Sequence, residues 1–310
     1  MSELASEPVS HQRFATNYDE VRDIRTFEPH RIPELLRSRA RRPFVPADGR
    51  LMIVAADHPA RGALGARGRA DAMASRPELL DRLRAALGRP GVDGVLGTAD
   101  ILEDLLLMGA LEGKVVVSSM NRGGLQGATF ELDDRLTGYD VAGTAAAGFE
   151  AIKMLTRIDL ADPASVATLE LCAQVVTDAN RAGVVAMVEP FLSNRVDGRV
   201  VNDLSPEAVI KSVHITQGLG SSSAYTWMKL PVVDQMERVM EATTLPTLLL
   251  GGDPTGAPEE TYASWKAALE LPSVRGLIVG RALLYPEDDD VAAAVDTAVS
   301  LVRPADVVAA

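Results

Sequence analysis

Cysteine is almost absent from this chain. Cys172 is the only cysteine among 310 residues, so neither an internal disulfide bond nor a cysteine-based zinc site can be built. Long apolar runs that would span a membrane are also missing, and the acidic first residues lack the basic and apolar regions of a secretory signal. These absences predict a cytoplasmic protein.

Basic charge is in short supply as well. The formal net charge of -12 argues against a general affinity for nucleic acid or an anionic membrane surface, because both would need a basic face. Hydrophobic residues nevertheless make up 47% of the chain, which indicates a folded rather than a disordered protein. A chain of 310 residues is long enough for one α/β barrel with additional segments.

Lysine is the rarest cation, since the chain has five lysines against 26 arginines. Two of the five, Lys153 and Lys229, fall inside apolar runs that otherwise predict buried strands. A desolvated lysine has a lowered pKa and can attack a ketone or aldehyde to form a Schiff base. The alternative for each is a lysine at a strand end whose stem is buried and whose ammonium reaches water.

Short apolar runs alternate with amphipathic stretches along the chain, a pattern typical of repeated βα units. The amphipathic stretches open near proline or a capping residue and predict helices at 77–87, 163–182, 206–212, 231–242 and 258–269. We expect eight strands, at 51–56, 94–96, 114–118, 151–155, 184–188, 225–229, 247–250 and 276–279.

Eight strands with intervening helices predict the α/β class, as a (β/α)8 TIM barrel. An open doubly wound sheet is disfavoured, because no glycine-rich dinucleotide fingerprint follows the first strand. Residues 1–47 differ in composition, with arginines interleaved with acids, and predict an N-terminal helical extension and linker; residues 48–310 would form the barrel. The extension would cap the bottom of the barrel or mediate a dimer.

Chemistry in such a barrel lies at the carboxyl ends of the strands, so the polar residues there are the site candidates. Each has an ordinary explanation, such as a turn cap, a solvated loop residue, a counter-ion or a partly solvated lysine. Together, two cations and two carboxylates at one barrel mouth fit carbon–carbon bond chemistry through an iminium ion. The candidates are Asp57, His58, Ser118, Ser119, Asn121, Arg122, Lys153, Arg157, Glu189 and Lys229.

Glycines at the ends of the last two strands predict a different function. Gly251 and Gly252 follow one strand, and Gly280 with Arg281 follows the next. Bare backbone amides at these positions can approach an anion, and barrels often bind phosphate there with the help of a helix amino terminus. The alternative is that these glycines serve ordinary turns.

These motifs together resemble the class I, Schiff-base aldolases of the deoxyribose-phosphate, tagatose-bisphosphate and archaeal-type fructose-bisphosphate aldolase group. The resemblance covers roughly residues 50 to 290 and is carried by strand-end motifs rather than by continuous identity. The matching segments are Ala-Ala-Asp57-His-Pro-Ala-Arg61-Gly, Gly148-Phe-Glu-Ala-Ile-Lys153, Val-Glu189-Pro-Phe, Trp-Met-Lys229-Leu-Pro and Gly280-Arg281.

The resemblance implies reversible aldol cleavage of a phosphorylated sugar or sugar acid, with no cofactor or metal. We expect a homo-oligomer, because symmetric oligomers are common. Lys229 would form the imine, Glu189 with Lys153 would move protons, and Asp57 would orient the amine or bind a substrate hydroxyl. Arg61, the glycines and Arg281 would bind substrate phosphate. Two segments depart from the family, namely the longer spacing from Asp57 to Arg61 and residues 119–124. Because such loops set specificity, the family's substrates do not transfer.

Two other functions stay open. A metal-dependent lyase or epimerase would need histidines at strand ends, and of His11, His30, His58 and His214 only His58 lies at one. A non-catalytic sugar-phosphate-binding barrel would keep the glycines and Arg281 but has no need of Lys229 and Glu189. Borohydride trapping with candidate substrates and sensitivity to EDTA would separate the three.

Overall fold

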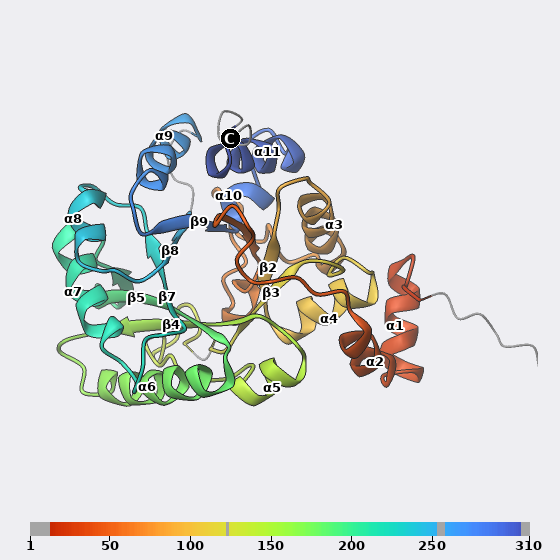
Figure 1. Cartoon of the computed structure of the whole chain (residues 1–310), viewed down its shortest axis with the longest axis horizontal. Coiled ribbons are helices and arrows are strands. Elements are labelled where there is room, and N and C mark those ends of the chain that lie inside the picture. The colour runs from red at the N-terminus through yellow and green to blue at the C-terminus, as the bar shows by residue number, and fades with distance from the viewer. Residues whose placement is uncertain (1–12, 122–123, 253–257, 305–310) are drawn as a thin grey trace, which may run out of the picture.

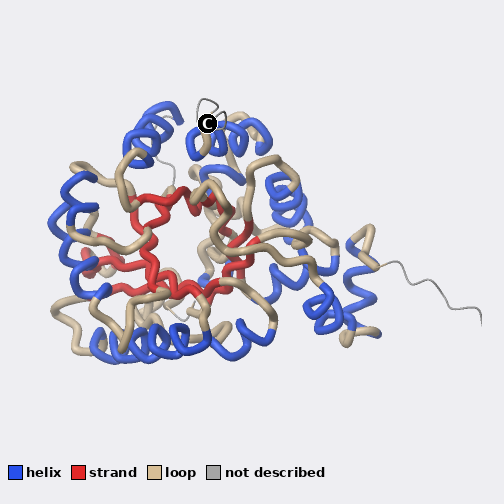
Figure 2. Tube along the Cα trace, in the orientation of Figure 1, coloured by secondary structure: helices blue, strands red, loops and turns tan. Residues whose placement is uncertain are grey.

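The computed structural model describes residues 13–121, 124–252 and 258–304. Within these residues, eight parallel strands close into a barrel, and helices surround it (Figures 1 and 2). Neighbouring strands follow the order β1, β2, β3, β4, β5, β7, β8, β9, and β9 pairs with β1 to close the ring. The strands are β1 (Leu51–Ala55), β2 (Gly94–Gly97), β3 (Val115–Ser119), β4 (Ala151–Ile158), β5 (Val185–Val196), β7 (Thr226–Pro231), β8 (Thr247–Leu250) and β9 (Val274–Val279).

The predicted (β/α)8 barrel is therefore confirmed, and every predicted strand is present. Helices before, between and after the strands surround the barrel in Figure 2, with α1 and α2 outermost. They are α1 (Tyr18–Phe27), α2 (Arg31–Ser38), η1 (Pro59–Arg61), α3 (Arg76–Leu87), α4 (Ala99–Leu107), α5 (Val141–Ala146), α6 (Ser165–Ala182), α7 (Pro206–Gln217), α8 (Met236–Glu241), α9 (Pro258–Leu269), α10 (Arg281–Leu284) and α11 (Val291–Val302). None of the described helices has the length and apolar run needed to cross a membrane.

Two helix boundaries were predicted wrongly. The helix expected at 206–212 runs on to Gln217 as α7. The segment from Pro231 to Ala242 was expected to be helical throughout, but Pro231 is the last residue of β7 and pairs with Leu250 of β8. The chain then passes through Gln235, whose φ of 57° lies in the left-handed region, before α8 begins at Met236. Proline fits a strand end as well as a helix start, because in both places its missing N–H is tolerated.

The interior of the barrel is filled by side chains at every second strand position, as the pleat of a β-strand requires. Phe44 closes the lower end, since its ring packs edge-on against Trp227 with 5.1 Å between the ring centroids. The predicted linker therefore contributes to the bottom of the barrel. The interior residues are Leu51, Ile53, Ala55, Leu96, Val115, Val117, Ala151, Val185, Met187, Trp227, Leu248 and Ile278.

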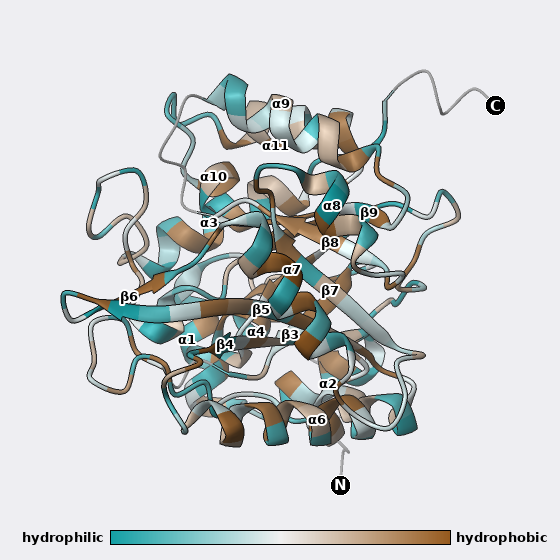
Figure 3. Cartoon of the chain, turned by 90° about the vertical axis from the view of Figure 1, so that its left-hand side faces the viewer, coloured by the Kyte–Doolittle hydropathy of each residue, from teal (hydrophilic) through white to brown (hydrophobic). Residues whose placement is uncertain are grey.

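A hairpin that was not predicted extends one strand beyond the barrel. β5 continues past the barrel wall and pairs antiparallel with β6 (Arg199–Asn202), and Figure 3 shows the two strands projecting together. The turn between them is Asp197-Gly198, and both residues have positive φ, 49° and 78°. Asp-Gly between alternating residues is a strong hairpin signal, because two-residue turns of this kind need positive φ at both positions.

The N-terminal helices α1 and α2 lie beside α3 and α4 (Figure 1), as the prediction of surface helices required. Their most buried anchor is Arg39, which follows α2. Its guanidinium is completely buried and donates to the carbonyls of Lys114 and Gly148 at 2.7 and 2.9 Å and to the Glu150 carboxylate at 3.0 Å. The division of the chain at residues 47 and 48 stays a prediction.

We expect Arg39→Ala to lower the free energy of unfolding by about 3–5 kcal/mol, because it leaves two carbonyls without their donor and the buried Glu150 carboxylate with only the largely exposed Arg41 as a cation. Arg22→Ala is the control, since Arg22 pairs with Asp19 on the exposed surface of α1 and should change stability little. Urea titration of the two variants measures both effects. Equal stabilities would show that α1 and α2 are not anchored by Arg39.

Candidate functional site

The two-residue period of the strands brings four ionisable side chains to the carboxyl end of the barrel. Lys153, Glu189 and Lys229 each lie two residues beyond an interior residue, namely Ala151, Met187 and Trp227. Asp57 likewise lies two residues beyond Ala55 of β1. Because alternate residues of a strand face the same side, all four side chains point into the barrel mouth.

The four side chains form a row of alternating charge, in the order Lys229, Glu189, Lys153, Asp57. The Lys229 Nζ lies 2.7 Å from Glu189 Oε1, and the Lys153 Nζ lies 3.0 Å from Glu189 Oε2. Lys153 Nζ also lies 2.7 Å from Asp57 Oδ2. The side chains of Asp57 and Lys153 are fully buried, and those of Lys229 and Glu189 are 4% and 10% exposed. Two cations and two carboxylates thus balance one another in a site almost closed to water.

Two serines at the end of β3 face opposite ways. Ser119 Oγ donates to Asp57 Oδ2 at 2.9 Å and so belongs to the charged cluster. Ser118 points out of the barrel and shares a hydrogen bond of 2.7 Å with Thr144 of α5. Of the two serine candidates, the structure therefore brings only Ser119 to the site.

A cavity of about 490 Å³ opens above the cluster. Glu189 and Lys229 line it from below, and the four predicted anion-binding positions Gly251, Gly252, Gly280 and Arg281 line its wall together with Arg61. Among the described residues, the ionised side chains in its lining are the cations Arg61, Arg157, Lys229 and Arg281 and the carboxylate Glu189. This excess of positive charge favours an anionic ligand, in contrast to the net charge of the whole chain.

The glycines of the cavity wall are needed for different reasons. A Cβ at Gly280 would lie 2.3 Å from the Ala55 carbonyl oxygen, and one at Gly251 would lie 2.7 Å from Val279. Gly252 has a φ of 65° and open space around its Cα. Close packing therefore requires glycine at the first two positions and backbone conformation requires it at the third. All three leave bare backbone at the cavity.

His58 follows Asp57 and lines the same cavity. Burial and the nearby charges of Arg281, Lys229 and Arg61 hold the pKa of His58 well below its ordinary value. Its imidazole is therefore neutral near pH 7. Among the described residues, no group of three or more histidine, cysteine, aspartate or glutamate side chains could hold a metal ion.

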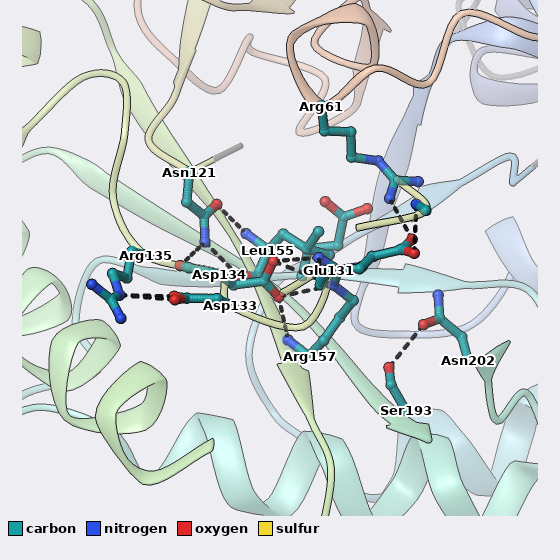
Figure 4. A network of polar contacts seen from close by, with 12 residues as sticks. Arg61, Asn121, Glu131, Asp133, Asp134, Arg135, Leu155, Arg157, Ser193 and Asn202 are labelled. Carbon is teal, nitrogen blue, oxygen red and sulfur yellow. Dashed lines mark hydrogen bonds and ion pairs between the residues drawn. The ribbon is translucent and has the colours of Figure 1, made fainter. Parts of the chain in front are cut away.

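The segment between β3 and α5, described at 120–121 and 124–140, is tied to the carboxyl end of β4. The candidate Arg122 lies outside the described residues. Asn121 acts as an extra rung of the β3–β4 pairing, because its side-chain amide donates to the Leu155 carbonyl at 2.6 Å and accepts from the Leu155 N–H at 2.8 Å (Figure 4). The N–H groups of Thr137 and Gly138 return to the Met120 carbonyl, so the two ends of this loop lie together.

Arg157 fastens the far side of the same loop. Its guanidinium is 3% exposed and is held by the Asp134 carboxylate, with 2.7 Å from Nη2 to Oδ1, and by the Glu131 carbonyl (Figure 4). Asp134 Oδ2 also accepts from the Arg157 N–H at 2.9 Å. Arg157 thus lines the cavity, but its guanidinium holds the segment between β3 and α5 in place. Most of its hydrogen-bond donors are therefore used within the protein.

Several lining residues were not predicted from the sequence. Phe191, Asn202 and Leu204 reach the cavity through the β5–β6 hairpin and the segment after it, and the Asp197-Gly198 turn was the signal that would have placed them. Glu131 lies between Arg61 and Arg157 at 3.8 and 3.9 Å. No local pattern marks it, because its partners are distant in sequence.

Comparison with known proteins gives a family. The sequence profile of the Cgl0159-like family matches residues 49–299. The crystal structure of Cgl0159 from Corynebacterium glutamicum is 57% identical, with a TM-score of 0.90, and the match covers 92% of this chain and 96% of that one. Among curated proteins, no sequence is similar enough to match.

More distant solved structures share the fold. An archaeal fructose 1,6-bisphosphate aldolase is 21% identical, with a TM-score of 0.62 and coverage of 87% of this chain and 98% of that one. An archaeal fructose-1,6-bisphosphate aldolase with its catalytic lysine bound to the carbinolamine intermediate of the substrate is 19% identical, with a TM-score of 0.60 and coverage of 87% and 99%. At this identity the likeness shows the fold alone.

We expect Lys153→Met to destabilise the fold by about 3–5 kcal/mol, because it strands the buried Asp57 carboxylate and removes one cation from Glu189. The double variant Asp57→Asn/Lys153→Met should recover part of this loss, since it removes the stranded charge as well. Urea denaturation of the wild type, both single variants and the double variant gives the coupling energy. Strictly additive effects would mean that the ion pair is not what the site depends on.

Proposed function

The chain belongs to the Cgl0159-like family, and from this premise we propose that it is a class I aldolase, a lyase that cleaves and forms a carbon–carbon bond through a Schiff base on Lys229. The observation that carries the proposal is the buried contact of 2.7 Å between the Lys229 amine and Glu189 at the base of a cavity. A nucleophilic amine with a proton acceptor in hydrogen-bond reach is what imine formation requires.

The same geometry suggests how the amine becomes a nucleophile. Glu189 Oε1 takes a proton from the Lys229 ammonium, and the neutral amine attacks the carbonyl carbon of the substrate. Glu189 then returns the proton to the carbinolamine hydroxyl, which leaves as water and gives the iminium ion. Lys153, on the other oxygen of Glu189, keeps a compensating positive charge beside that carboxylate throughout.

Cleavage follows from the electron demand of the iminium ion. A base takes the proton of the β-hydroxyl group, the carbon–carbon bond breaks, and its electron pair moves into the enamine while the aldehyde leaves. Protonation of the enamine carbon and hydrolysis of the imine release the ketone and restore Lys229. Asp57 and Ser119 hold Lys153 in place from the far side and so keep Glu189 oriented.

The distant structures add support of a limited kind. Among the solved structures with this fold, one is described as a Schiff-base-forming fructose-1,6-bisphosphate aldolase, at 20% identity and a TM-score of 0.60. The fold therefore accommodates imine chemistry in at least one other protein. The charged cluster of this chain supplies the groups that the same chemistry needs.

We also propose that the substrate carries a phosphate group bound by Gly251, Gly252, Gly280 and Arg281. These residues line one wall of the cavity after β8 and β9, where barrels commonly bind phosphate. Gly280 is the N-cap of α10, so the first backbone N–H groups of that short helix also lie next to Arg281. A tetrahedral dianion can use several such donors at once.

The central test is borohydride reduction in the presence of dihydroxyacetone phosphate. The wild type should gain the mass of one reduced adduct on Lys229, whereas Lys229→Met should gain none and lose aldol turnover altogether. Lys211→Met is the matched control, because Lys211 is exposed on α7 and should be trapped like the wild type. An adduct that persists in Lys229→Met, or normal turnover in that variant, would overturn the proposal.

Arg281→Ala tests the phosphate site. We expect kcat/KM for a phosphorylated substrate to fall by about 10- to 100-fold, the effect of losing one charge-assisted hydrogen bond, with a much smaller loss for the same substrate without phosphate. Part of the loss should appear in kcat, since binding energy from a remote phosphate helps to position the reacting bond. Equal losses for the two substrates would assign Arg281 a role in the fold instead.

A further inference from the structure

Arg61 differs from Arg157, the other arginine beside Glu131, in what holds it. It ends η1, directly after β1, and its side chain is 21% exposed. Its one ion pair within the described part of the chain is the 3.8 Å contact with Glu131, and among those residues its guanidinium donates no hydrogen bond. Burying a guanidinium without hydrogen bonds costs free energy, so a ligand that accepts them would be bound strongly.

The neighbouring Arg157 provides the contrast. Both guanidinium groups approach the same oxygen, Glu131 Oε1, at 3.8 and 3.9 Å (Figure 4). Arg157 is occupied by Asp134 and by the Glu131 carbonyl, as described above. Glu131 in turn accepts the Gly127 N–H at 2.8 Å, so this carboxylate is also engaged. Arg61 is therefore the cation of this group that faces the cavity with its donors available.

The charge around Arg61 points to an anion. Burial and the positive charges of Arg157 and Arg281 lower the pKa of Arg61, against the opposing effect of Glu131. A bound anion would relieve this repulsion. Glu131 limits its charge, because a dianion close to that carboxylate would be repelled more strongly than a monoanion.

The topology separates this group from the phosphate site. Arg281 follows β9, and the backbone of Arg61 follows the neighbouring strand β1, but the Arg61 guanidinium reaches away toward Glu131 and Arg157, and Arg157 lies on β4. In the strand order, β4 stands four strands from β9 in either direction around the barrel, and β7 with Lys229 stands midway along one of those arcs. A substrate bound by both groups would therefore present its middle carbons to Lys229.

We propose that Arg61 binds a carboxylate at the end of the substrate remote from the phosphate, so that the substrate class is a phosphorylated keto sugar acid; this inference rests on the proposed aldolase function. The planar fork of one guanidinium matches the two oxygens of a carboxylate. A phosphate is better served by several converging donors, which the glycine wall near Arg281 offers and the surroundings of Arg61 do not.

The reaction balances without a co-reactant. Cleavage between the two anchored ends leaves the phosphate on one fragment and the carboxylate on the other, with the bonding pair retained on the ketone fragment as the enamine. The aldehyde fragment keeps the hydroxyl oxygen as its carbonyl, and the proton lost from that hydroxyl is recovered when the enamine carbon is protonated.

The test measures condensation with matched pairs of reactants that differ only in the carboxylate. One set joins dihydroxyacetone phosphate to 4-oxobutanoate or to the neutral 4-hydroxybutanal, with shorter homologues of each. The other set joins glyceraldehyde 3-phosphate to pyruvate or to the neutral hydroxyacetone. In the set that the wild type turns over, we expect the carboxylate member to be preferred in kcat/KM by about 10- to 100-fold.

Arg61→Gln should abolish that preference, and Arg61→Lys should restore part of it, because lysine keeps the charge but lacks the fork. Arg69→Gln is the matched control, since Arg69 is exposed in the same segment and does not line the cavity, so the preference should persist. Melting temperatures of the three variants report any loss of fold.

Three outcomes would overturn the carboxylate assignment: no preference for the carboxylate in either set, a preference that survives in Arg61→Gln, or a stronger preference for glycolaldehyde phosphate as the acceptor. In each of these, borohydride trapping of dihydroxyacetone phosphate or pyruvate on Lys229 would still support the aldolase. Absence of trapping with both ketones would count against the aldolase itself, and with it against the role of Arg61.

Discussion

The buried ammonium of Lys153 is the constraint on which the barrel mouth depends. It lies within 3.0 Å of two carboxylates from other strands, Asp57 and Glu189, and its side chain has no exposure to water. Removing such a charge from water costs free energy, and the attraction of its partners offsets that cost only in close and well-fixed geometry. A buried ion pair of this kind therefore adds little net stability to the fold. It makes sense where the orientation of Glu189 toward Lys229 has to be maintained through a reaction that moves protons.

The sequence predicts the part of this arrangement that follows from periodicity. Short apolar runs identify the eight strands, and the alternation of facing sides then places Asp57, Lys153, Glu189 and Lys229 in one mouth, where the structure has them. The prediction fails where local rules compete. Pro231 signals a helix start as well as a strand end, and Asp197-Gly198 marks a hairpin that lies outside the regular βα repeat. The same alternation places Ser119 in the barrel and Ser118 outside it. The sequence alone does not assign the two serines to these sides, because a strand boundary that is uncertain by one residue reverses which side each faces.

The segment between β3 and α5 could not be predicted from the sequence, because no local pattern encodes its contacts. Asn121 binds the backbone of Leu155, and Asp134 binds Arg157, across 34 and 23 residues of chain. Each of these side chains is an ordinary polar residue until its partner is known. What the sequence alone could have suggested is only that Arg157 continues the inward-facing row of β4 beyond Lys153, and so needs an acidic partner or an anionic ligand. The structure supplies the acidic partner, and Arg61 is left with its donors facing the cavity.

The distribution of charge has a consequence for substrate capture. The chain carries a net charge of -12, yet among the described residues that line the cavity four ionised side chains are cations and one is a carboxylate. An acidic exterior repels anions in general, while a narrow basic cavity with low-dielectric walls attracts the few that reach it, and the difference falls off within about 8 Å at physiological salt. A small anion therefore gains most of its electrostatic energy after entering. Selection among anions would then rest on how their charges are spaced within the cavity, relative to the cations Arg61, Lys229 and Arg281 that line it.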